Sequence, residues 1–151
     1  MADSNKSVVI GSDHGAVELK EKVTAFLEKN GYTVDDLGTH GDDPIDYPEI
    51  SKKVCETFLK GDYAFGVVLC GTGIGVSIAA NKVPGIRCAL IHDPFTAEMA
   101  KAHNNANIIA MGGRIKYDQP LEMILSAYLD TEFLGEERHA RRVAKLSALD
   151  R

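Results

Sequence analysis

The stretch VVLCGTGIGVSIAANK, residues 67–82, contains the pattern that decides the fold. A run of small and β-branched apolar residues ends in Cys70, and Gly71, Gly73 and Gly75 follow at every second position. Beyond the glycines the composition favours a helix. This order predicts a buried strand, a glycine-rich turn and a short helix. It also raises the question of why a single thiol stands at the mouth of the turn.

Strands and helices alternate on both sides of this stretch. The apolar pattern predicts strands at 7–12, 32–37, 63–70, 86–92 and 107–111, and helices at 14–30, 48–60, 75–82, 94–104, 118–130 and 136–149. Five strands alternating with helices predict right-handed βαβ units, and therefore an α/β fold with a five-stranded parallel sheet and helices on both faces. The 151 residues contain no linker or internal repeat, so we expect a single domain over residues 1–151.

The composition argues against several classes of protein. The net charge is −5 and neither half of the chain is basic, which disfavours nucleic-acid and membrane-surface binding. No apolar run approaches the roughly 18 residues of a membrane span, and the polar start does not resemble a signal peptide. The three cysteines lack zinc or disulfide spacing and the five histidines lack metal spacing. We therefore expect reduced thiols, no metal site and a cytoplasmic location.

Reactive and polar residues follow the predicted strands. The first strand leads into Asp13 and His14, the third into Cys70 and its glycines, and the fifth into Arg114. Ligands of parallel α/β sheets bind outside the carboxyl ends of the strands. Loops are polar in any case, but the position of Cys70 favours an active site along this edge.

The glycine turn over residues 71–75 predicts a cradle for an anion, because glycines allow close backbone approach and exposed N–H groups attract negative charge. It is not a P-loop, since no Gly-Lys-Ser/Thr follows. A dinucleotide fingerprint would need a different glycine spacing after the first strand. Asp93, at the end of the next strand, nevertheless keeps a nucleotide-binding module open as an alternative.

Cys70 supplies chemistry that the cradle alone lacks. Backbone N–H groups beside a thiol lower its pKa, and the same groups stabilise an oxyanion on a substrate. A base beside an oxyanion cradle is the arrangement that abstracts a proton next to a carbonyl. The alternative is that Cys70 is a small core residue. For Cys55 and Cys88, within a predicted helix and a predicted strand, we prefer that alternative.

Two arginines suggest a phosphate site. Arg138 and Arg142 stand four residues apart and share one helix face, which suits paired hydrogen bonds to phosphate. Ion pairs with Glu136 and Glu137 on a solvated face explain the spacing equally well. His103 precedes the fifth strand and should lie at the opposite edge from Cys70, so the two can share a site only if a second subunit contributes His103.

Seven motifs together closely resemble the type B ribose-5-phosphate isomerase family, which also contains galactose-6-phosphate and allose-6-phosphate isomerases. They are GSDH (11–14), DYP (46–48), CGTGIG (70–75), SIAANKVPGIR (77–87), HNNAN (103–107), GGR (112–114) and GEERHARR (135–142). The resemblance implies a flavodoxin-like, Rossmann-like three-layer domain that acts without metal or organic cofactor. It also implies a homodimer or tetramer with composite active sites.

The resemblance also implies roles for individual residues. Cys70 corresponds to the base and Thr72 to its helper, Gly71, Gly73, Ile74 and Gly75 to the cradle, His103 to the group that opens the sugar ring, Asn104, Asp13 and Tyr47 to substrate contacts, and His14, Arg114, Arg138 and Arg142 to the phosphate site. One branch of the family has serine at the Cys70 position and a glutamate base at the Ile74 position. This chain resembles the cysteine branch.

The leading hypothesis is an isomerase that interconverts D-ribose 5-phosphate and D-ribulose 5-phosphate through an enediolate, the reaction that the pentose phosphate pathway uses. A hexose-6-phosphate isomerase acting on allose or galactose phosphate differs by one carbon and stays open. A nucleotide-binding module without chemistry is the alternative from another class.

Overall fold

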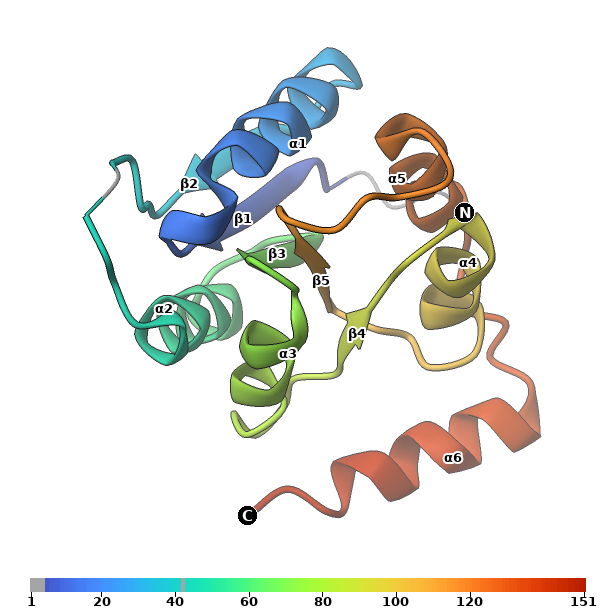
Figure 1. Cartoon of the computed structure of the whole chain (residues 1–151). Coiled ribbons are helices and arrows are strands. Elements are labelled where there is room, and N and C mark those ends of the chain that lie inside the picture. Colours follow the sequence, from blue (N-terminus) through green and yellow to red (C-terminus); the bar gives the residue numbers. More distant parts are fainter. Residues whose placement is uncertain (1–4, 42) are drawn as a thin grey trace.

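The architecture is a parallel sheet between two layers of helices (Figure 1). The computed structural model describes residues 5–41 and 43–151. The strands are β1 (Ser7–Ser12), β2 (Thr33–Asp36), β3 (Phe65–Cys70), β4 (Cys88–Leu90) and β5 (Ile108–Gly112). All neighbouring pairs are parallel, and the order across the sheet is β2-β1-β3-β5-β4. The predicted five-stranded parallel sheet is confirmed.

All helices but the last divide between the two faces of the sheet, and the last lies outside both helix layers (Figure 1). The helices are the 3₁₀ turn η1 (His14–Ala16), α1 (Val17–Lys29), α2 (Tyr47–Lys60), α3 (Ile74–Ala80), α4 (Pro94–Ala102), α5 (Leu121–Leu129) and α6 (Glu137–Ser147). Residues of α1, α4 and α5 share one buried cluster with the sheet, and residues of α2 and α3 share another. None of the described helices is long and apolar enough to cross a membrane.

The last two strands lie in the reverse of the flavodoxin-like order, in which the fourth strand is the neighbour of the third. Here β5 lies beside β3, and β4 forms the edge. All five residues of β5 are buried, whereas those of β4 are only half-buried. A strand buried on both faces belongs in the interior of a parallel sheet. The α/β class is therefore as predicted, with a different arrangement of these two strands.

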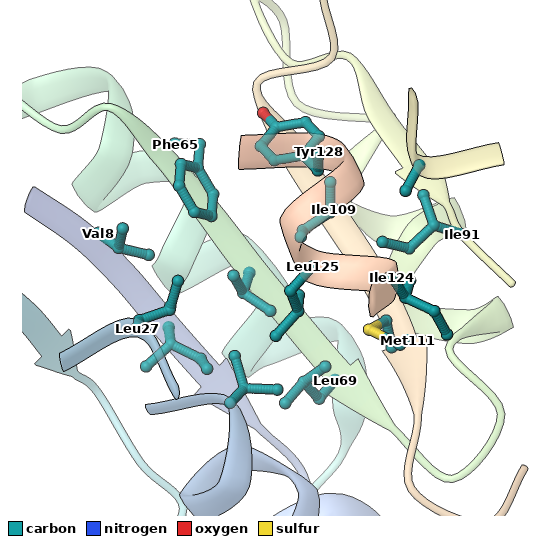
Figure 2. Packing of buried hydrophobic residues seen from close by; sticks show 14 of the residues in the cluster. Val8, Leu27, Phe65, Leu69, Ile91, Ile109, Met111, Ile124, Leu125 and Tyr128 are labelled. Carbon is teal, nitrogen blue, oxygen red and sulfur yellow. The ribbon is translucent and has the colours of Figure 1, made fainter. Parts of the chain in front are cut away.

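The larger core lies between the sheet and α1, α4 and α5 (Figure 2). Val8, Leu27 and Ile109 are fully buried there. Phe65 and Tyr128 meet edge to face, with ring centroids 5.0 Å apart. The buried Tyr128 hydroxyl donates a hydrogen bond of 2.6 Å to the Ala106 carbonyl. This core fixes the strand ends that carry the functional residues.

The edge strand β4 is shorter than the predicted segment 86–92 and ends at Leu90. The side chain of Asn81 pairs with the outer side of this strand. Its Oδ1 accepts a hydrogen bond of 2.8 Å from the Cys88 N–H, and its Nδ2 donates one of 2.9 Å to the Cys88 carbonyl. Farther out, a cavity of about 560 Å³ separates β4 from α6.

Candidate active site

Cys70 lies where β3 meets the glycine turn, and 5% of its surface is exposed. Its Sγ accepts a hydrogen bond of 3.1 Å from the Gly73 N–H. Gly73 has φ +80°, a left-handed conformation that favours glycine and directs its N–H back toward the sulfur. The turn therefore holds the Cys70 sulfur against a backbone N–H group, the arrangement that the sequence predicted.

The end of β5 lies against the turn. The Gly113 N–H donates a hydrogen bond of 2.8 Å to the Cys70 carbonyl, and the Arg114 N–H donates one of 2.8 Å to the Gly71 carbonyl. The Arg114 side chain packs against Gly71, since a Cβ added at Gly71 would lie 3.1 Å from its Nη1. A guanidinium therefore stands at the entrance of the predicted anion cradle.

The end of β1 reaches the cradle from the other side. The helix predicted over residues 14–30 begins at Val17, because the 3₁₀ turn η1 comes before α1. Asp13 caps this turn, and its Oδ1 accepts a hydrogen bond of 2.8 Å from the Gly15 N–H. A Cβ at Gly15 would lie 3.0 Å from the Gly71 nitrogen. The exposed His14 accepts a hydrogen bond of 3.3 Å from the Ile45 N–H.

Tyr47 covers the far end of the turn. A Cβ at Gly75 would lie 2.5 Å from Cε1 of the Tyr47 ring. Thr72 faces solvent, and its Oγ1 accepts a hydrogen bond of 3.2 Å from the Ile74 N–H. The structure thus brings together ten of the predicted site residues, namely Asp13, His14, Tyr47, Cys70, Gly71, Thr72, Gly73, Ile74, Gly75 and Arg114.

The other four predicted residues lie elsewhere in the chain. His103 caps the carboxyl end of α4, which precedes β5, and Asn104 follows it. Cys70 lies at the carboxyl end of β3, whereas His103 precedes the amino end of β5. The two residues are therefore at opposite ends of the parallel strands, as the sequence predicted. Arg138 and Arg142 belong to α6, which lies beside the edge strand (Figure 1). Within one chain the predicted site is therefore in two parts.

The arginines of α6 have different partners. Arg138 Nε lies 3.4 Å from a carboxylate oxygen of Glu136, and Arg141 forms a two-pronged contact with Glu137 at 2.7 and 2.8 Å. Arg142 has no ion-pair partner among the described residues. Of the two arginines predicted to bind phosphate, the ion-pairing alternative therefore holds for Arg138 and not for Arg142.

The other two thiols share a core cluster with Cys70 but do not lie at the glycine turn. Burial raises the pKa of Cys55 to about 12, and burial likewise raises the pKa of Cys88. Both side chains pack in the core cluster beneath α2 and α3. They are suited to packing rather than to proton transfer, as the sequence predicted.

Asp93 does not have the role that a nucleotide-binding module would require. Its Oδ1 accepts a hydrogen bond of 2.7 Å from the Thr96 N–H, and the Thr96 hydroxyl returns to the backbone of Asp93 in a capping box. These hydrogen bonds lower the pKa of Asp93. The carboxylate is occupied in starting α4, which removes the one residue that supported the nucleotide hypothesis. No group of three or more potential metal ligands occurs among the described residues.

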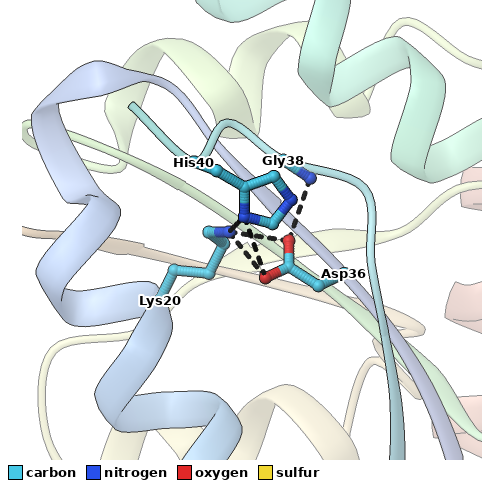
Figure 3. Close-up of polar contacts among 4 residues, drawn as sticks. All are labelled: Lys20, Asp36, Gly38 and His40. Atoms are coloured by element: carbon cyan, nitrogen blue, oxygen red, sulfur yellow. Dashed lines mark hydrogen bonds and ion pairs between the residues drawn. The ribbon is translucent and has the colours of Figure 1, made fainter. Parts of the chain in front are cut away.

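A buried lysine on α1 holds the loop that leads from β2 toward the site (Figure 3). The Lys20 side chain is 1% exposed, and its Nζ contacts both carboxylate oxygens of Asp36 at 2.7 and 2.6 Å. Asp36 in turn accepts a hydrogen bond of 2.9 Å from the Gly38 N–H. The Gly38 carbonyl accepts one of 2.7 Å from the Ser12 N–H. This chain of contacts ends beside Asp13 and fixes the start of the loop that leads to Tyr47.

The arrangement has counterparts among known proteins. A family profile described as Ribose/Galactose Isomerase matches residues 8–146. The chain belongs to this family. It is 35% identical over 145 residues to ribose-5-phosphate isomerase B of Escherichia coli, which covers 96% of this chain and 97% of the relative. A solved ribose-5-phosphate isomerase of Thermotoga maritima has a TM-score of 0.90 at 43% identity, with 97% of this chain and 100% of that chain covered.

Other relatives act on sugar phosphates of different length. A D-erythrulose-4-phosphate isomerase of Pectobacterium atrosepticum is 41% identical over 131 residues, covering 85% of this chain and 86% of the relative. A galactose-6-phosphate isomerase subunit of Clostridium acetobutylicum is 42% identical over 126 residues, covering 83% of this chain and 73% of the relative. The chain is thus a sugar-phosphate isomerase, within a family whose members differ in substrate.

Proposed function

We propose that the protein interconverts D-ribose 5-phosphate and D-ribulose 5-phosphate, with Cys70 as the base. The observation that carries the proposal is the hydrogen bond of 3.1 Å from the Gly73 N–H to the Cys70 sulfur. A thiolate held there removes the C2 proton of the open-chain aldose, and the electrons move into an enediolate. Return of the proton to C1 gives the ketose. Ile74 has no ionisable group, so Cys70 has no competing base within the cradle.

The polar groups around Cys70 suit the remaining requirements of this reaction. Backbone N–H groups of the turn stabilise the enediolate oxygen, and the Thr72 hydroxyl helps to move the oxygen-bound proton. Asp13 and Tyr47 flank the space where the sugar hydroxyls would lie. Arg114 and His14 place a guanidinium and an imidazole at the entrance, where a phosphate gains charge-assisted hydrogen bonds.

The second part of the site comes from a partner subunit in this proposal. His103, Asn104, Arg138 and Arg142 lie at the edge of the sheet away from Cys70, and a two-fold dimer would bring them over the partner's cradle. His103 would open the sugar ring, and the two arginines would complete the phosphate site. The guanidinium of Arg142, which has no ion-pair partner in the part of the chain that the structure describes, supports this role.

The direct test is an isomerisation assay with ribose 5-phosphate in the presence of a chelator. We expect turnover to persist, because the proposed chemistry uses only side chains and backbone of the protein. Ribose, allose and galactose phosphates and erythrulose 4-phosphate should be compared side by side. The relatives named for four-carbon and six-carbon sugars make a different chain length the second candidate. Faster turnover of one of these substrates would replace the pentose assignment.

Subunit mixing tests the composite site. Cys70→Ala and His103→Ala are prepared separately, shown to be inactive, and then denatured and refolded together. A mixed dimer has one site with both substitutions and one with neither. Random pairing makes about half of the dimers mixed, so about a quarter of the wild-type activity should return. Verified heterodimers without activity would contradict a site shared between subunits.

A further inference from the structure

Among the described residues of α6, only His139 is buried, and it has no part in the proposed function. His139 is 3% exposed, while its neighbours on the helix face solvent. Its imidazole stacks on the imidazole of His103, with ring centroids 4.3 Å apart and an angle of 16° between the planes. The Nε2 of His139 has no hydrogen-bond partner among the described residues. The ring is therefore buried for its contact with His103 rather than for a hydrogen bond at that nitrogen.

This stack connects the end of α4, which carries His103, to α6, which carries the two arginines. Both belong to the part of the site that one subunit would contribute to its partner. Arg138 and Arg142 lie one residue before and three residues after His139 on the same helix. Just before α6, the Leu134 N–H donates a hydrogen bond of 3.1 Å to the Ala102 carbonyl, next to His103. The contact between the two imidazoles is thus the point where the end of α4 meets the helix that carries the arginines.

The charges around His139 favour its neutral form. Burial lowers its pKa first, and the positive charges of His103, Arg138 and Arg142 lower it further, against an opposite effect of Glu136. A neutral ring can stack on His103 whether His103 is charged or not, whereas two stacked imidazolium ions would repel each other. His139 therefore suits a supporting role in which His103 alone exchanges protons.

We propose that His139 is a positioning residue that fixes the imidazole of His103 for opening the sugar ring. The inference rests on the proposed function. Ring opening breaks the C1–O4 bond and forms the C1 carbonyl, while a proton leaves the O1 hydroxyl and a proton is delivered to O4. One imidazole can serve both oxygens only in a restricted orientation, because proton transfer requires hydrogen-bond distance and alignment. A flat ring stacked beneath it restricts that orientation without taking part in the proton transfer.

Ribulose 5-phosphate separates the ring step from the Cys70 step. Its O5 is esterified, so it cannot close to a furanose and is always open-chain. In D₂O, exchange of its C1 proton reports proton abstraction by Cys70 alone. Conversion to ribose 5-phosphate additionally includes ring closure. Both rates are measured by NMR in one sample, and their ratio is the readout.

The variants are His139→Leu, which keeps apolar volume without a flat ring, and His139→Phe, which keeps a flat ring. For His139→Leu we expect conversion to fall about 10- to 100-fold, with C1 exchange close to that of the wild type. His139→Phe should restore most of the conversion. His103→Ala should show the same pattern as His139→Leu, with a larger effect. Lys145→Ala, an exposed position on α6, is the matched control.

A parallel fall in exchange and conversion, or a rise in KM for both sugars with an unchanged ratio, would show that His139 only anchors α6 and would overturn the inference. An unchanged ratio in folded His139→Leu would do the same. Thermal unfolding establishes folding. If His139→Leu does not fold, the same raised ratio of C1 exchange to conversion is expected in folded His139→Gln, and an unchanged ratio there would overturn the inference. Failure of the proposed function is distinct, because the wild-type protein would then neither exchange nor convert ribulose 5-phosphate.

Discussion

Replacing Gly112 by alanine tests whether the position of the glycine turn controls activity. Gly112 ends β5 and pairs with Cys70 of β3. A Cβ at Gly112 would lie 2.5 Å from the carbonyl carbon of Thr72 and 2.7 Å from its Cα. These are backbone atoms, so no side-chain rotation can relieve the overlap. The substitution therefore pushes directly on the turn that holds the thiol.

The size of the effect follows from the overlap. Ordinary van der Waals contact begins at 3.4 Å, so a contact of 2.5 Å must lengthen by about 0.9 Å. Overpacking of this kind costs about 1–3 kcal/mol of stability, which leaves a typical domain folded. A misplacement of about 1 Å in an active site can lower the rate about 100-fold. We therefore expect a folded Gly112→Ala protein whose kcat on ribose 5-phosphate falls by about that factor.

The assay is steady-state formation of ribulose 5-phosphate, with thermal unfolding to establish that the variant is folded. Slower alkylation of Cys70 by iodoacetamide would show that the turn no longer holds the thiol in its reactive position. Gly41→Ala is the matched control, since a Cβ there meets nothing within 4 Å. A folded Gly112→Ala protein with the wild-type kcat would refute the reasoning, because the turn could then shift without affecting the reaction.

Two further predictions concern the thiol and the buried lysine. Cys70→Ala should lower kcat about 10²–10⁴-fold, as loss of a general base does, whereas Cys55→Ala should leave kcat unchanged because that thiol is buried in the core. Steady-state kinetics of both folded variants check this, and an active Cys70→Ala would exclude Cys70 as the base. Lys20→Met should lower the free energy of unfolding in urea by about 3 kcal/mol, because it removes the buried cation that contacts both carboxylate oxygens of Asp36. Lys22→Met removes only an exposed ion pair and should change that free energy by less than about 0.5 kcal/mol; equal effects at the two lysines would contradict this account.

The glycine turn could be predicted because its determinants are adjacent in the sequence. A buried strand that ends in Cys70, followed by alternating glycines and a helix, specifies strand, turn and helix locally. The existence of the other elements followed from the same short-range patterns. Their edges shifted by a few residues, as at β4, because an exposed edge strand is limited by pairing and not by its apolar composition.

The order of the strands depends on contacts that no local pattern encodes. The segments 86–92 and 107–111 have similar apolar compositions, yet only β5 is buried throughout. The strand that helices bury on both faces takes the place next to β3, and this burial depends on helices that are distant in the sequence. The resemblance implied the three layers and the five-stranded parallel sheet, which the structure confirms, and the place of β5 beside β3 was not part of that prediction.

The two supporting residues differ in how far the sequence could have revealed them. Lys20 stands three and seven residues before Val23 and Leu27, on the apolar face of α1, and a charged residue at that spacing suggests a buried ion pair. His139 gave no such signal. It lies among charged residues of α6, and only the stack on His103, 36 positions earlier in the chain, accounts for its burial.

The amide of Asn81 has a consequence for how this protein behaves at high concentration. An edge strand presents unpaired N–H and C=O groups, which can recruit a strand from another molecule and start aggregation. The Asn81 side chain pairs with both the N–H and the C=O of Cys88, the first residue of β4. It stands where a sixth strand would begin to pair. A single side chain thereby blocks the first pairing position on that side of the sheet.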